Sequence, residues 1–343
     1  MAASLSRSIA RMNKHNLRHA PAADLDAVAR RYAVAVTPVM QELIDAEHYA
    51  GPISKQFVPD ERELDAAAEE LPDPIGDGPH APVPGIVHRY PDRVLLMPTK
   101  ICAAYCRFCF RREVVGHPEG AVLPAPELAA ALEYIREHEE IWEVILSGGD
   151  PLILSPRRLD QILTELRTIA HVRVVRVHTR VPLVAPEKIT RELTDALRRA
   201  APLFVVLHAN HADEFTRQGQ AACARLVDAG IPLLGQSVLL RGVNDDAATL
   251  EALLRRLVEN RIKPYYLHHA DRATGTAHFR TSLAAGRALA ADLRGRVSGI
   301  CQPAYVLDIP GGYGKSPVGP DYVRERPDGI DVRDVDGRWH AYE

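Results

Sequence analysis

The chain has 343 residues, enough to bury a sizeable core in one large domain or two ordinary ones. Lys and Arg number 42 against 45 Asp and Glu, and this formal net charge of -3 excludes a strongly basic binder of nucleic acid or of an anionic membrane. No apolar run approaches the roughly 18 residues of a membrane span, so we expect neither nucleic acid nor membrane as partner, but a small molecule.

Residues 1–84 are expected to form an N-terminal helical region and a linker. Residues 1–19 are basic and resemble a transit peptide slightly, but we interpret them as an ordinary basic arm because they contain no apolar secretory core. Ala-rich helical patterns follow. The run PDPIGDGPHAPVPG at 72–85 is typical of a linker, since proline and glycine interrupt both helices and strands.

Short apolar runs alternate with helical patterns from residue 93 onward. The six candidate strands are 93–100, 142–149, 172–179, 203–210, 232–240 and 263–270. Between them, apolar residues three and four apart predict helices within 126–140, 155–170, 186–200 and 245–261, and one ending near Gly230. Ser155 is the expected N-cap of the second helix, and Pro156 its first residue. The strands must be parallel, and a doubly wound sheet and a partial barrel both satisfy this pattern.

Three cysteines, Cys102, Cys106 and Cys109, lie in the run KICAAYCRFCFRR directly after the first of these strands. Such crowding favours metal ligation, because a cysteine that only packs needs no neighbours of its kind. Structural zinc would recruit a fourth ligand, whereas a [4Fe-4S] cluster on three thiolates leaves one iron open to a ligand. The other two, Cys223 and Cys301, are expected to pack in the core. Five cysteines in so long a chain argue against a disulfide framework and for a reducing, cytoplasmic compartment.

Further candidate residues follow the later strands. Gly148 and Gly149 in SGGDPL lack side chains, so the backbone could approach a ligand closely there or simply turn. His208 and Gln236 lie at strand ends, the rim where parallel α/β folds bind ligands, although each could equally be a satisfied polar residue. Lys315 follows three glycines in DIPGGYGKSP, which suits either a Schiff-base lysine or a solvated turn.

The cysteine spacing C-x3-C-x2-C, with Phe108 just before the third cysteine, resembles the radical S-adenosylmethionine superfamily. The runs HRYPDRVLL, SGGDPL, GQSVLLRGVND, PYYLHHAD and DIPGGYGKSP further resemble lysine 2,3-aminomutase, over residues 85–323. The resemblance implies an isomerase with an α/β fold, a partial (β/α)6 TIM-like barrel over 85–310. A C-terminal segment, 311–343, would carry the lysine that binds pyridoxal phosphate. The implied cofactors are a [4Fe-4S] cluster, S-adenosylmethionine and pyridoxal 5′-phosphate.

The resemblance also implies a role for each matching residue. Cys102, Cys106 and Cys109 would hold the cluster, and Gly148, Gly149, Asp150, His208 and Gln236 would bind S-adenosylmethionine. Lys315, the catalytic residue, would bind pyridoxal phosphate together with Arg89, Tyr90 and Arg93. Arg111 would bind the substrate carboxylate, and Asp271 and Asp308 its distal ammonium. Two arginines suit a phosphate, and two acids opposite an arginine suit lysine better than glutamate, whose side-chain carboxylate they would repel.

The reaction implied is migration of the 2-amino group of L-lysine to carbon 3, started by reduction of S-adenosylmethionine at the cluster by a reducing electron donor. Three alternatives stay open: the β-lysine-forming branch that modifies elongation factor P, a related enzyme for another amino acid, and a zinc-stabilised binding module without catalysis. The chain ends at Glu343 without the C-terminal cysteines that bind zinc at a subunit contact in longer members, so an expected homo-oligomer would assemble without that zinc contact.

Overall fold

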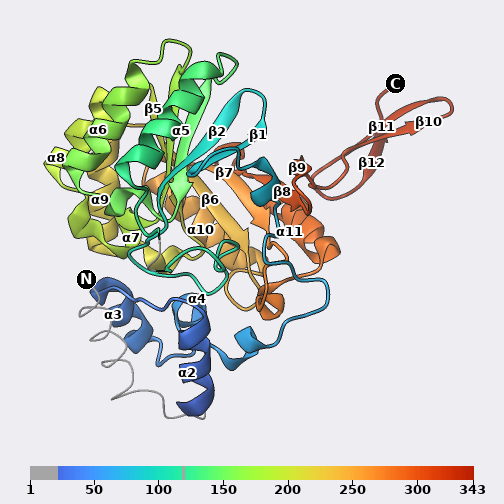
Figure 1. Ribbon diagram of the computed structural model, residues 1–343. Coiled ribbons are helices and arrows are strands. Elements are labelled where there is room, and N and C mark those ends of the chain that lie inside the picture. Colours follow the sequence, from blue (N-terminus) through green and yellow to red (C-terminus); the bar gives the residue numbers. More distant parts are fainter. Residues whose placement is uncertain (1–21, 118–119) are drawn as a thin grey trace.

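The computed structural model describes residues 22–117 and 120–343 (Figure 1). The arm at residues 1–19 lies outside them. A nine-stranded sheet forms the centre, and its strands follow one another in chain order from β1 to β9. They are β1 (Ile86–Tyr90), β2 (Arg93–Thr99), β3 (Glu143–Gly148), β4 (Val174–Thr179), β5 (Leu203–His208), β6 (Leu233–Leu239), β7 (Ile262–His269), β8 (Ala304–Ile309) and β9 (Gly314–Pro317).

Strands β2 to β8 run parallel to their neighbours, and β1 and β9 pair antiparallel at the two edges. A doubly wound sheet reverses its strand order at a switch point, whereas this sheet never does. The prediction of a partial barrel is therefore confirmed. All six predicted strands are present; β8 was missed because the charged Asp308 interrupts a run of only six residues.

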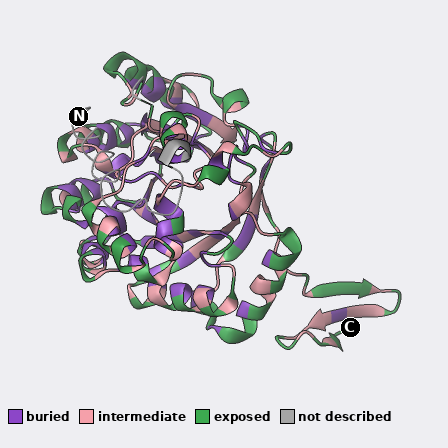
Figure 2. Cartoon of the chain, turned by 90° about the horizontal axis from the view of Figure 1, so that it is seen from below, coloured by how far each residue is buried: buried purple, intermediate pink, exposed green. Residues whose placement is uncertain are grey.

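Helices cover the outer side of the curved sheet, and their exposed faces point away from it (Figure 2). They are α5 (Ala125–Glu137), α6 (Pro156–Arg167), α8 (Arg191–Arg199), α9 (Arg217–Asp228), α10 (Ala247–Glu259) and α11 (Leu283–Arg296). The short helix α7 (Val181–Val184) is buried along its whole length. As predicted, the Ser155 side chain caps α6 by accepting from the Arg158 backbone N–H, with Pro156 as the first helical residue. Gly230, at φ +80°, follows the end of α9. The apolar faces of the helices close one continuous core against the strands.

The N-terminal helices α2 (Ala22–Arg31), α3 (Pro38–Ala46) and α4 (Pro52–Phe57) lie together at one end of the barrel (Figure 1). A short 3-10 helix, Glu61–Leu64, follows them. The proline- and glycine-rich segment 72–85 then passes close to the loop before Lys315: a Cβ on Gly76 would lie 2.5 Å from the Gly312 nitrogen. The residue at this crossing must be glycine, also because its φ is +67°.

Beyond β9, the strands β10 (Val323–Arg326), β11 (Gly329–Arg333) and β12 (Trp339–Ala341) form a separate antiparallel sheet. This sheet stands away from the barrel (Figure 1). β9 itself, which carries Lys315, pairs with β8 inside the main sheet. The three-part division of the chain stays a prediction. Among the described residues, no helix is both long enough and apolar enough to cross a bilayer.

Candidate active site

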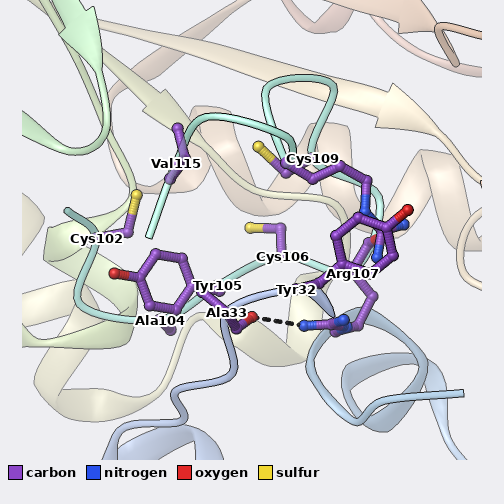
Figure 3. A pocket seen from close by; sticks show the side chains of 10 residues that line it. Tyr32, Ala33, Cys102, Ala104, Tyr105, Cys106, Arg107, Cys109 and Val115 are labelled. Atoms are coloured by element: carbon purple, nitrogen blue, oxygen red, sulfur yellow. Dashed lines mark hydrogen bonds between the residues drawn. The ribbon is translucent and has the colours of Figure 1, made fainter. Parts of the chain in front are cut away.

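The loop that follows β2 places the thiols of Cys102, Cys106 and Cys109 on different sides of one cavity (Figure 3). All three cysteines are free. Within the described part of the chain, no three His, Cys, Asp or Glu side chains gather around a single metal-ion position. A four-iron cluster instead accepts each thiolate at a separate iron, so three thiols spread around a cavity suit it as a donor set.

The surroundings of Cys102 and Cys109 disfavour a bare thiolate. Burial raises the pKa of Cys109 to about 11, and the neighbouring Cys106 adds to the shift. Burial likewise raises the pKa of Cys102 well above its usual value, as does the charge of Asp150. Arg180 Nη1 donates a hydrogen bond to Cys106 Sγ at 2.9 Å. Iron would supply positive charge that stabilises the thiolates of Cys102 and Cys109, so cluster binding should release protons.

A buried ion group anchors this loop to the N-terminal region. Glu63, in the 3-10 helix, is fully buried and accepts from Arg107 Nη2 at 2.5 Å and from Arg112 Nη2. Arg107 Nη1 also donates to the Ala33 carbonyl at 2.8 Å (Figure 3). The two arginines flank Cys109 in the sequence, so the group fixes the loop on both sides of that thiol.

The turn after β3 packs against the start of the cysteine loop, at Lys100 and Ile101. A Cβ on Gly149 would lie 2.3 Å from the Ile101 carbonyl oxygen, and Gly148 has a φ of +99°. Asp150 accepts from Thr179 Oγ1 and from the Arg180 backbone N–H, each at 2.7 Å. The two glycines therefore serve a close approach of backbone to backbone, and Asp150 joins the ends of β3 and β4. A role of this turn toward S-adenosylmethionine stays a prediction.

His208 is the last residue of β5, whereas its register partner Gln236 lies in the middle of β6 and not at a strand end as expected. The His208 ring stacks on Phe108 of the cysteine loop, with the ring centroids 5.7 Å apart. Burial lowers the pKa of His208 well below its usual value, as does the charge of Arg180. Its Nε2 is buried and has no hydrogen-bond partner among the described residues. A neutral imidazole with one unsatisfied nitrogen next to the cysteine loop suits a polar ligand.

The second group of side chains gathers around Lys315 on β9. Lys315 and Asp308 are register partners across β8 and β9, and Lys315 Nζ forms an ion pair with the Asp308 carboxylate. Nζ also lies 3.3 Å from His268 Nδ1, and the Lys315 backbone N–H donates to Tyr90 Oη at 2.7 Å. Burial alone would raise the pKa of Asp308, but His268 and the Lys315 ammonium hold it below its usual range.

Arginines and an aromatic ring from β1 and β2 border this group. The Arg93 guanidinium lies over the Tyr90 ring, 3.8 Å from its centroid. Arg89 Nη1 is 3.7 Å from Asp308 Oδ1, and Arg89 Nε is buried without a hydrogen-bond partner among the described residues. A donor left free in this way is available to an anion such as a phosphate.

Asp271 and Arg111 complete the group. Burial raises the pKa of Asp271 to about 7, and the charge of Asp308 adds to the shift. The cations Lys315 and Arg111 counteract it, so Asp271 shares the same electrostatic site as both. Arg111 donates from Nε to Asp77 Oδ2 at 2.7 Å. The structure thus brings the residues predicted for pyridoxal phosphate and substrate together.

Sequence reasoning missed several residues of the site. Glu63 carried only the signal of a capping box with Asp60, which the structure indeed shows. Asp77 lay in the expected linker, and Arg180 carried no signal at all because its partners Glu214, Gln56 and Cys106 are distant in the sequence. His268 stands within the run PYYLHHAD, but no residue near it in the sequence shows that it faces Lys315.

Comparison with known proteins shows the family of this chain. Residues 96–254 match the model of the Radical SAM superfamily. The L-lysine 2,3-aminomutase of Clostridium subterminale is 43% identical over 305 residues, which cover 89% of this chain and 73% of that protein. The L-lysine 2,3-aminomutase of Acetoanaerobium sticklandii is 45% identical, with coverages of 84% and 70%. Glutamate 2,3-aminomutase of Clostridioides difficile is 37% identical, with coverages of 91% and 74%. The chain therefore belongs to the lysine 2,3-aminomutase family of the radical SAM superfamily.

Proposed function

We propose that this protein is an isomerase that converts free L-lysine into β-lysine by moving the amino group from carbon 2 to carbon 3. The observation that carries the proposal is the charge pattern of one site. Asp308 and Asp271 share it with Lys315 and with the arginine Arg111. Lysine needs this pattern, because its distal ammonium pairs with acids while its carboxylate pairs with an arginine.

The cofactors would be held by the two groups of side chains. Cys102, Cys106 and Cys109 would hold a [4Fe-4S] cluster, with S-adenosylmethionine beside it against Gly148, Gly149, Asp150, His208 and Gln236. Lys315, Arg89, Tyr90 and Arg93 would hold pyridoxal phosphate. When bound, the cluster and S-adenosylmethionine supply a radical, and pyridoxal phosphate supplies the carbonyl that carries the amino group.

The protein's own part is to position the substrate and manage charge. The Lys315 ammonium pairs with Asp308, as the distal ammonium of lysine would. Lys315 must release that carboxylate and become neutral to act as a nucleophile. His268 Nδ1 lies 3.3 Å from Lys315 Nζ, and burial lowers the pKa of His268, so a neutral imidazole stands beside the amine and adds no positive charge there.

Substrate choice tests the proposal. Under anaerobic conditions with S-adenosylmethionine and a reductant, the protein should convert lysine into its β-isomer and leave glutamate unchanged, since Asp308 and Asp271 would repel a second substrate carboxylate. Chromatography of the amino acids measures both products. Faster formation of a product from glutamate, or none from free lysine, would overturn the assignment.

Lysine affinity should rise with pH, because Asp271 is protonated below its pKa of about 7 in the free protein. Its carboxylate, which attracts the distal ammonium, forms only as the pH passes through that value. One such proton predicts about tenfold tighter binding at pH 8 than at pH 6. Titration of the protein loaded with pyridoxal phosphate measures this, and Asp271→Asn should flatten the profile. The same raised pKa means that Asp271 lowers folding stability as the pH rises from about 4 to 7.

We further propose a cytoplasmic location, a reducing electron donor for the cluster and a homo-oligomeric assembly, with no nucleic-acid or membrane partner. All five cysteines are free thiols in the structure. Free thiols of this kind are typical of a reducing compartment, and this supports the cytoplasmic location.

A further inference from the structure

We propose that Asp77 is a positioning residue that orients Arg111 toward the carboxylate of the substrate. The inference rests on the proposed function in one respect, namely that an amino-acid carboxylate is the ligand of Arg111. Asp77 belongs to the segment 72–85, whose composition predicts only a linker. Its carboxylate nevertheless lies between two arginines of the site.

Each oxygen of Asp77 serves one arginine. Oδ2 accepts from Arg111 Nε at 2.7 Å, and Oδ1 accepts from Arg89 Nη2 at 2.9 Å. The Asp77 side chain is 17% exposed, and those of Arg111 and Arg89 are 9% and 10% exposed. Charge-assisted hydrogen bonds in such enclosed surroundings are short and strong. Asp77 therefore fixes the positions of both guanidinium groups.

The contact with Arg111 leaves a particular edge of the guanidinium free. Asp77 occupies Nε, and the structure records no hydrogen bond from Arg111 Nη1 or Nη2 to any described residue. The guanidinium also lies over the Phe110 ring, 4.4 Å from its centroid. Two contacts thus set its plane and its rotation. The paired terminal nitrogens remain for a bidentate bond to a carboxylate.

Asp77 is itself held rigidly from two sides. The backbone N–H groups of Asp77 and Gly78 donate to the Asp73 carboxylate, each at 2.8 Å. On the other side, Gly76 packs so closely on Gly312 that no side chain would fit between them. This contact ties the position of Asp77 to the glycine loop that leads into Lys315. A preorganised carboxylate of this kind keeps Arg111 in place before the substrate arrives.

The two arginines depend on Asp77 to different degrees. Arg89 has a second carboxylate nearby, since its Nη1 lies 3.7 Å from Asp308 Oδ1. Arg111 forms its one recorded ion pair, among the described residues, with Asp77. Loss of the Asp77 charge should therefore affect the binding of the substrate carboxylate far more than the retention of pyridoxal phosphate.

The experiment uses the Asp77→Asn variant of the protein loaded with its cluster and pyridoxal phosphate. Lysine is titrated without S-adenosylmethionine, and the absorbance of bound pyridoxal phosphate reports binding without turnover. We expect lysine to bind about tenfold or more weakly, because a hydrogen bond to a charged group is lost, with the content of pyridoxal phosphate unchanged. The matched control is Asp160→Asn, which removes a carboxylate paired with Arg199 at 2.8 Å on the outer helices. It should leave lysine affinity unchanged.

A double-variant comparison separates positioning from a general effect. If Asp77 acts through Arg111, then Asp77→Asn should weaken binding little further in a protein that already carries Arg111→Met. Normal lysine affinity in Asp77→Asn, or losses that multiply in the double variant, would overturn the proposal. Loss of the bound cofactors from Asp77→Asn would overturn it too, by showing a role in folding. Titration of the unsubstituted protein tests the proposed substrate separately. If that protein does not bind lysine, then the proposed function is wrong, and with it the premise that Arg111 binds the lysine carboxylate.

Discussion

Lys315→Ala should abolish the absorbance of covalently bound pyridoxal phosphate and reduce turnover on the order of 10³-fold or more, while the absorbance of the iron cluster remains. The structure places Lys315 on β9, with its amine against Asp308 and His268 and its backbone N–H on Tyr90. The cysteines lie in the loop after β2, and the recorded hydrogen bonds of Lys315, among the described residues, go to Tyr90, His268 and Asp308 and to none of these cysteines. Removing the amine should therefore affect one cofactor and spare the other.

Lys263→Ala is the control for this prediction. Lys263 lies on β7, and its amine donates to the backbone carbonyls of Pro264 and Gln302 and, within the described part of the chain, to no side chain. Absorption spectra, iron content and product assays of both variants measure the separation. Retention of the covalent absorbance in Lys315→Ala would show that another lysine binds pyridoxal phosphate. If Lys315→Ala also lost its iron, then the cysteines and the side chains around Lys315 would form one structural unit.

Glu63→Gln should destabilise the protein by about 3–5 kcal/mol, because it leaves Arg107 and Arg112 as buried cations without a counter-charge. Both arginines are almost fully buried, so water cannot take the place of the carboxylate. The same change frees the loop on each side of Cys109. We therefore expect a lower unfolding temperature and also a lower iron content after reconstitution.

The control is Glu251→Gln, which breaks an ion pair with Arg255 on the surface of α10. An exposed pair one helical turn apart contributes only about 0.3–0.5 kcal/mol, so the unfolding temperature and the iron content should barely change. Thermal unfolding and iron analysis compare the two variants. Equal effects of the two substitutions would contradict the structural role assigned to Glu63.

The sequence predicted the strands and helices well because their signals are local and repeated, whereas the choice of a partial barrel over a doubly wound sheet came from the family resemblance. Each strand is a short apolar run, each helix has apolar residues three or four apart, and caps such as Ser155 mark the boundaries. The cysteine loop and the lysine loop were also predictable, since each is a compact motif. The edge strand β9 gave no such signal, because GKSP contains no β-branched or aromatic residue.

The acids that hold the arginines near the two groups could not be predicted in this way. Asp77 and Glu63 are single acids whose partners lie 34 and 44 residues further along the chain, and such a pairing leaves no periodic pattern. The interpretation of segment 72–85 as a linker followed from its prolines and glycines. Gly76 is needed there for close packing on the lysine loop. The prolines and glycines thus indicate that segment 72–85 is neither α-helix nor strand. They do not indicate which other segment of the chain it contacts, because the fold determines that.

The central claim is that amino migration on lysine occurs at this site. The most direct measurement is nuclear magnetic resonance of the product formed anaerobically from lysine labelled with ¹⁵N at the 2-amino group, with S-adenosylmethionine and a reductant present. We predict that the label appears on carbon 3 of β-lysine and that the distal amino group stays unlabelled. A label that remains on carbon 2, or a β-lysine that has lost it to the solvent, would contradict the account.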